Sequence, residues 1–75
     1  MFHIIEFMGQ FAINLELSAK GGLERFITRK GVRVRTKIKP HVEETQDGPV
    51  EVADLFFEDG TITRSVPYDY FSFVE

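Results

Sequence analysis

The sequence has no cysteine and no tryptophan, and only two histidines among its 75 residues. Without cysteine the chain forms no disulfide, no thiolate nucleophile and no cysteine-based zinc site. His3 and His41 lie far apart in the sequence, and Glu43, Glu44 and Asp47 lack the spacing of a calcium-binding loop. A phosphate-binding glycine loop and a Gly-x-Ser-x-Gly motif are also missing. We therefore expect no enzyme activity, no metal, no cofactor and no small-molecule substrate.

Long apolar runs are missing as well. Residues 1–17 are rich in apolar side chains, but Glu6, Gln10, Asn14 and Glu16 interrupt them, so the segment is too polar to span a membrane. A length of 75 residues allows one domain with a small core. These features predict a single cytoplasmic domain that makes no membrane contact.

Each half of the chain is poor in charge of one sign. Residues 1–42 hold eight lysines or arginines against three glutamates, and residues 43–75 hold nine acids against Arg64 alone. One interpretation is a surface that binds a polyanion or a charged partner. The other is that the two halves pair with each other inside the fold.

Residues 50–66 contain the strongest local signal, a β-hairpin centred on Asp59-Gly60. This pair favours a two-residue type I′ turn, whose central residues both need positive φ. Counting outward from such a turn assigns the cross-strand pairs. On the core face the expected pairs are Phe57 with Ile62, Leu55 with Arg64 and Ala53 with Val66; on the other face they are Phe56 with Thr63 and Asp54 with Ser65.

The first 30 residues predict a second hairpin and one ambiguous segment. Residues 2–17 alternate as two strands, and Gly9-Gln10 suits a type II′ turn between them. Residues 18–22 are a loop by composition. Residues 23–30 carry helix start and stop signals, but a strand that turns at Lys30-Gly31 is the competing interpretation.

A half-buried strand follows from Val32, with apolar residues on one face and Arg33, Arg35, Lys37 and Lys39 on the other. We call these four cations the basic row. Pro40 is expected to end this strand, and residues 41–48 to form a mobile loop. After the central hairpin, Pro67 predicts a short helical turn and then a last short strand.

In residues 31–74, GVRVRTKI is followed by a polar loop, GPVEV, FFEDGTITRSVP and YFSFV. This order resembles SH3-like barrels of the Tudor and KOW type, which implies an all-β small barrel over residues 31–74. Residues 2–17 would add an N-terminal β-hairpin, and residues 23–30 one short helix on one interpretation. The expected core is Ile4, Phe11, Ile13, Leu15, Val32, Val34, Ile38, Ala53, Leu55, Phe57, Ile62, Val66 and Phe71.

The basic row, extended by Arg29 and Lys30, is one candidate binding surface. Alternate strand residues lie roughly 6.6 to 6.8 Å apart, so the row could follow a phosphate backbone. The resemblance agrees, because KOW modules often bind nucleic acid or ribosomal partners. The alternative is a solvated strand face whose cations pair with acids on neighbouring strands.

A second candidate site is an aromatic cage. Tudor domains hold a methylated cation between aromatic rings beside an acid, and Phe56, Asp54 and Tyr68 or Tyr70 could form such a cage. The alternative is ordinary core packing of these rings.

These observations favour a non-catalytic binding or adaptor module that regulates or joins a larger protein assembly. The apolar hairpin expected at residues 2–17 has edges that could pair with a protein partner or form a homodimer. The alternative function is binding of RNA or DNA through the basic strand.

Overall fold

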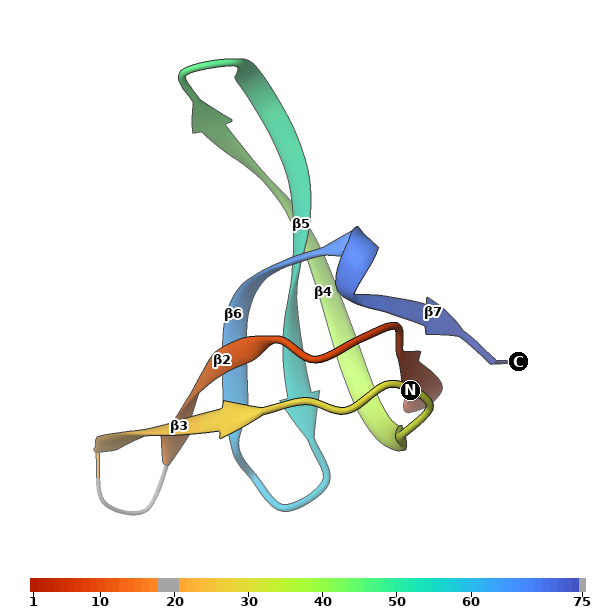
Figure 1. Cartoon of the computed structure of the whole chain (residues 1–75). Coiled ribbons are helices and arrows are strands. Elements are labelled where there is room, and N and C mark those ends of the chain that lie inside the picture. The colour runs from red at the N-terminus through yellow and green to blue at the C-terminus, as the bar shows by residue number, and fades with distance from the viewer. Residues whose placement is uncertain (18–20, 75) are drawn as a thin grey trace.

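The computed structural model describes residues 1–17 and 21–74, so residues 18–20 of the expected loop lie outside the described residues. Its strands are β1 (His3–Phe7), β2 (Ala12–Leu17), β3 (Gly22–Ile27), β4 (Arg33–Thr45), β5 (Gly48–Phe57), β6 (Ile62–Pro67) and β7 (Phe71–Phe73). They form one antiparallel sheet in the order β3-β2-β6-β5-β4-β1-β7, curled into a half-barrel (Figure 1). The all-β class is confirmed, as is a helical turn before the last strand, the 3-10 turn η1 (Tyr68–Tyr70).

The N-terminal hairpin prediction was wrong. β1 pairs with β4 and β7, and β2 pairs with β3 and β6, so the two strands do not pair with each other. Gly9 does not take the positive φ of a type II′ turn. The connection is instead a corner held by the fully buried Thr28, whose hydroxyl donates to the Gly9 carbonyl (2.8 Å) and accepts from the Phe11 N–H (2.9 Å).

Residues 23–30 form a strand and a turn, and the helix interpretation was wrong. All six residues of β3 pair with β2, and this pairing satisfies backbone groups that a two-turn helix would leave open. The chain then turns through Gly31 at φ +87°, where the Val32 N–H donates to the Arg29 carbonyl at 3.2 Å.

The central hairpin has a three-residue loop in place of the expected type I′ turn. The Phe57 N–H bonds to the Thr61 carbonyl (2.9 Å), and Gly60 alone takes positive φ, +89°. This loop moves the register by one, so Leu55 faces Thr63 and Phe56 faces Ile62. Asp59 accepts hydrogen bonds from the hydroxyl and the backbone N–H of Thr61, and these lower the pKa of Asp59.

A β-bulge in β6 corrects the register. Arg64 and Ser65 together lie opposite Asp54, which restores the expected pair of Ala53 with Val66. Ser65 takes φ +59°, the left-handed region that is rare for serine. Its N–H donates to the Asp54 carboxylate at 3.0 Å, which stabilises this conformation.

β4 is longer than predicted. Its first half alternates as expected, with Thr36 buried and the basic row exposed, but the strand continues through Pro40 to Thr45. Proline is tolerated there because β1 pairs with β4 only as far as Thr36, which leaves the outer edge of β4 open at Pro40. Residues 41–48 therefore do not form the expected loop. Residues 42–51, which we call the arm, form a two-stranded ribbon that projects from the half-barrel (Figure 1).

The core packs on the concave face of the sheet. Its buried cluster consists of Ile5, Phe7, Ala53, Leu55, Val66 and Phe71. The expected Ile4 is only half-buried, because it shares a face of β1 with Glu6 and the alternation places Ile5 and Phe7 inside. Val32, also expected inside, is 41% exposed.

Leu55→Ala is expected to lower the free energy of unfolding by about 2 to 5 kcal/mol, because it opens a cavity at a fully buried position. Leu23→Ala is the matched control, since Leu23 is 71% exposed and its loss should stay within about 0.5 kcal/mol. Urea titration measures both. A loss below about 1 kcal/mol for Leu55→Ala would mean that Leu55 does not face the core.

Candidate protein-binding site

The sheet ends at β3, whose outer edge has no partner strand among the described residues. The Thr28 N–H bonds to the Phe11 carbonyl at 2.8 Å, just beyond the paired segment. Hydrogen-bonded and non-bonded pairs alternate along an antiparallel ladder. Counting back from Thr28, the next residues that bond to β2 are Phe26 and Glu24. Leu23, Arg25 and Ile27 alternate with them and therefore direct their N–H and C=O groups away from β2, toward the open edge.

Both faces of β3 carry exposed apolar side chains, together with one charge each, Glu24 on one face and Arg25 on the other. Phe26 lies opposite the buried Ile13 and so belongs to the concave face, whereas Leu23 and Ile27 belong to the convex face. Phe26 is 45% exposed and Ile27 43%. An edge strand normally carries lysine, proline or inward charges that block pairing with other chains. β3 has no lysine or proline, and its inward charge is Glu24, which shares the concave face with Phe26.

The open edge of β4 is different. It carries Lys37, Lys39 and Pro40, the residue types that discourage strand pairing. Of these two edges, that of β3 is the one suited to accept another strand.

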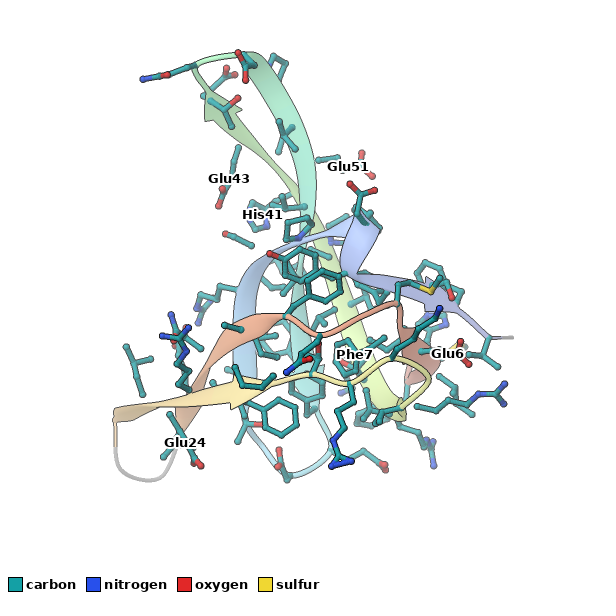
Figure 2. The ribbon with its side chains drawn as sticks, in the orientation of Figure 1. Glu6, Phe7, Glu24, His41, Glu43 and Glu51 are labelled. Atoms are coloured by element: carbon teal, nitrogen blue, oxygen red, sulfur yellow. The ribbon has the colours of Figure 1, made fainter. Side chains whose placement is uncertain are left out.

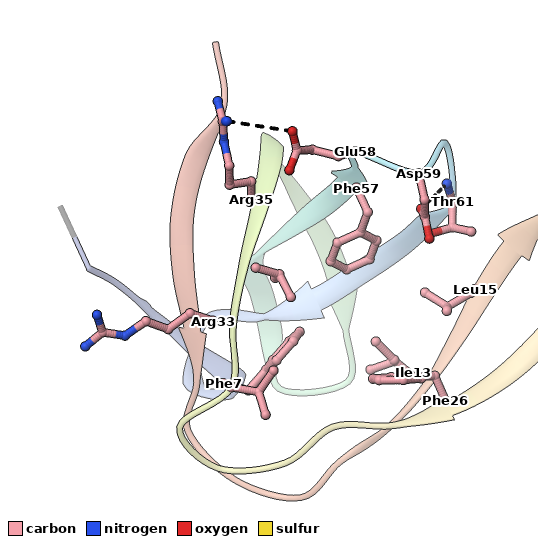
Figure 3. A pocket seen from close by; sticks show the side chains of 12 residues that line it. Phe7, Ile13, Leu15, Phe26, Arg33, Arg35, Phe57, Glu58, Asp59 and Thr61 are labelled. Atoms are coloured by element: carbon pink, nitrogen blue, oxygen red, sulfur yellow. Dashed lines mark hydrogen bonds and ion pairs between the residues drawn. The ribbon is translucent and has the colours of Figure 1, made fainter.

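An apolar groove of about 490 Å³ opens on the concave face beside β3 (Figure 3). Its walls come from Phe7, Ile13, Leu15, Phe26, Val32, Val34 and Phe57. In Figure 3, Phe26, Ile13 and Leu15 lie on one side and Phe7 and Arg33 on the other. The volume is in the range of ligand sites, but the groove extends to an open strand edge, as in sites that bind an extended chain.

The groove has a charged rim. The Arg35 guanidinium lies 3.8 Å from the Glu58 carboxylate (Figure 3), and Arg33 lies 3.1 Å from Glu6. Arg33, Arg35 and Glu58 are more than half exposed and Glu6 is 30% exposed, and ion pairs of this kind contribute only about 0 to 1 kcal/mol each. The rim can therefore exchange its internal pairs for contacts with a bound partner.

The basic row is placed on one exposed face of β4, as expected. It is partly neutralised, because Arg33 and Arg35 pair with acids, and Lys37 lies 5.1 Å from the Phe2 ring centre. Lys39 is exposed, and it forms no ion pair within the described part of the chain; the same is true of Arg29 and Lys30 in the turn before β4.

The structure does not bring the cage residues together. Tyr70 stacks on Phe11 with ring centres 3.9 Å apart, and Tyr68 packs against Phe71 at 5.4 Å. Burial, and then the nearby charge of Glu51, raise the pKa of Tyr68. Phe56 makes no ring contact with either tyrosine in the described residues. Packing, the alternative interpretation, describes these tyrosines better.

The sequence did not indicate a polar network at the base of the arm. His41 directs Nδ1 toward Asp54 (3.5 Å) and Nε2 toward Glu43 (3.4 Å), and the Ser65 hydroxyl donates to Glu43. Figure 2 shows His41 and Glu43 at this position. The hydrogen bonds from Ser65 and His41 lower the pKa of Glu43. The Ser65 hydroxyl oxygen also lies 3.4 Å from His41 Nε2, so Glu43 and Ser65 both face this ring nitrogen while Asp54 faces the other.

Arg64 extends the network across the sheet. Its guanidinium lies 2.6 Å from Glu16 on β2 and 3.6 Å from Asp54 on β5, and the hydrogen bond to Glu16 raises the pKa of Arg64. The network thus links β2, β4, β5 and β6 and fastens the arm to the half-barrel. The sequence indicated only that Asp54 and Ser65 pair. The other contacts of this network were not predicted, because the β-bulge places both Arg64 and Ser65 opposite Asp54.

The described residues contain no cluster of three or more histidine or acidic side chains arranged to hold a metal ion. Within residues 1–17 and 21–74, no helix has the length and apolar character that a membrane crossing needs. No protein-family model, no curated protein and no solved structure matches this chain. The features of this chain that bear on function are the open edge of β3, the groove and the charged surfaces.

Proposed function

We propose that this chain is a non-catalytic protein-binding module that joins or regulates a larger assembly. The partner contacts the open side of the half-barrel, formed by the outer edge of β3 and the groove. One observation carries the proposal: an unpaired strand edge with exposed Leu23, Phe26 and Ile27 adjoins an apolar groove. Burial of such surface stabilises a complex by about 25 cal/mol per Å² of apolar area, before the costs of association.

We also propose that the fold is related to SH3-like barrels of the Tudor and KOW type. The support is the order of elements from β4 onward: a long hairpin, a third meander strand, a 3-10 turn and a short last strand.

Nucleic-acid binding through the basic row is the second candidate function. The observation in its favour is that Lys39, Arg29 and Lys30 are exposed and have no acid partner among the described residues. It ranks second because β4 continues directly into the arm, whose Glu43, Glu44 and Asp47 would repel a phosphate backbone.

Affinity capture with Phe26→Ser tests the proposed function. Loss of an aromatic contact at the centre of an interface should reduce capture of bound proteins at least about tenfold. The matched control is Phe73→Ser, because Phe73 is half exposed on β7, at the opposite end of the sheet. Circular dichroism checks that both variants fold.

Equal capture by wild type and Phe26→Ser, or no captured protein at all, would contradict the proposal. Recovery of RNA or DNA that is lost in a Lys37→Ala/Lys39→Ala variant, with a steep decline in salt, would favour the second candidate.

A further inference from the structure

We infer that the partner is an extended segment of a different protein that adds to β3 as an extra strand, with an acidic side chain opposite Arg25. This inference rests on the proposed function and names the kind of partner. The backbone groups of Leu23, Arg25 and Ile27 are the ones that a new strand would pair with. β3 has six residues, which suits a segment of about five to seven residues.

A second copy of this chain does not suit the edge. In an antiparallel dimer the outward-facing residues must pair with outward-facing residues. A twofold axis at Arg25 sets Arg25 opposite its own copy, and an axis at Glu24 sets Glu24 opposite its copy. Like charges directly opposite each other are destabilising. An axis at Phe26 avoids this clash. It sets Gly22 and Leu23 opposite the turn that follows Ile27, however, so that only part of β3 would pair with a strand of the second copy.

The two faces of β3 define the side chains that the partner needs. On the convex face, Arg25 lies between Leu23 and Ile27, and it has no acid partner among the described residues. A strand that pairs here would gain from an acid opposite Arg25 and apolar residues two positions away on either side. On the concave face, the partner residue opposite Phe26 would enter the groove, where an apolar side chain is favoured.

A displayed library of randomised seven-residue segments, selected on the full chain, tests the inference. The enriched segments are then tested on Arg25→Pro, which removes the Arg25 charge and one outward N–H but keeps the backbone groups of Glu24 and Phe26 that face β2. We expect enriched segments to alternate apolar residues around a central acid and to bind wild type at least about tenfold more tightly than Arg25→Pro. Arg25→Glu, which keeps the backbone donor, should select segments with a central lysine or arginine.

The outcomes separate the two proposals. Segments that bind Arg25→Pro as tightly as wild type, or that show no change of central charge with Arg25→Glu, would overturn strand addition. If such segments still lose binding in Phe26→Ser, the protein-binding function survives. No enrichment on wild type would overturn both.

Discussion

Phe7→Ala is expected to lower the free energy of unfolding by about 3 to 5 kcal/mol. Phe7 is 2% exposed, packs in the core cluster and forms part of the groove. Its backbone also holds the start of β4, because its N–H donates to the Val32 carbonyl and its carbonyl accepts from Gly31. A domain of this length has a total stability of only about 4 to 11 kcal/mol, so the variant should be largely or wholly unfolded in mild urea.

Phe73→Ala is the matched control for this substitution. Phe73 is on the neighbouring β7 and is 50% exposed, so its loss should stay below about 1 kcal/mol. Urea titrations of the two variants give the comparison. A loss below about 1 kcal/mol for Phe7→Ala, no larger than that of the control, would mean that β1 presents its other face, with Ile4, to the core.

The sequence predicted strands better than it predicted their partners. Alternation identified β2 and the first half of β4, because each buries only one face. The partners of β1 and β2 were missed because Gly9-Gln10 resembles a hairpin turn locally. The buried Thr28, which holds the corner instead, is far away in the sequence.

Local turn chemistry was also ambiguous. Asp59-Gly60 suits a type I′ turn, but it suits equally a three-residue loop in which only Gly60 takes positive φ. The polar, acidic composition of residues 41–48 predicted a loop, but these residues form a two-stranded ribbon because β4 pairs with β5 as far as Thr45 and Gly48. In both places, contacts between strands decided the outcome.

The candidate site was the hardest part to predict. The spacing of Leu23, Phe26 and Ile27 favoured a helix with one buried face, and the predicted open edge was placed on the N-terminal hairpin. Which strand lacks a neighbour depends on how the whole sheet closes, and no local pattern contains that information. The basic row, by contrast, was correctly placed on an exposed face, because strand alternation alone determines it.

Amide hydrogen exchange along β3, followed by NMR, tests the central claim that this edge is open. The N–H groups of Glu24 and Phe26 point toward β2 and should be protected. Those of Leu23, Arg25 and Ile27 point to solvent and should exchange at least about a hundredfold faster. Slow exchange at all five positions would show that the edge is already covered, and fast exchange at all five would show that β3 is not a stable strand. Either result would contradict a binding site built on this edge.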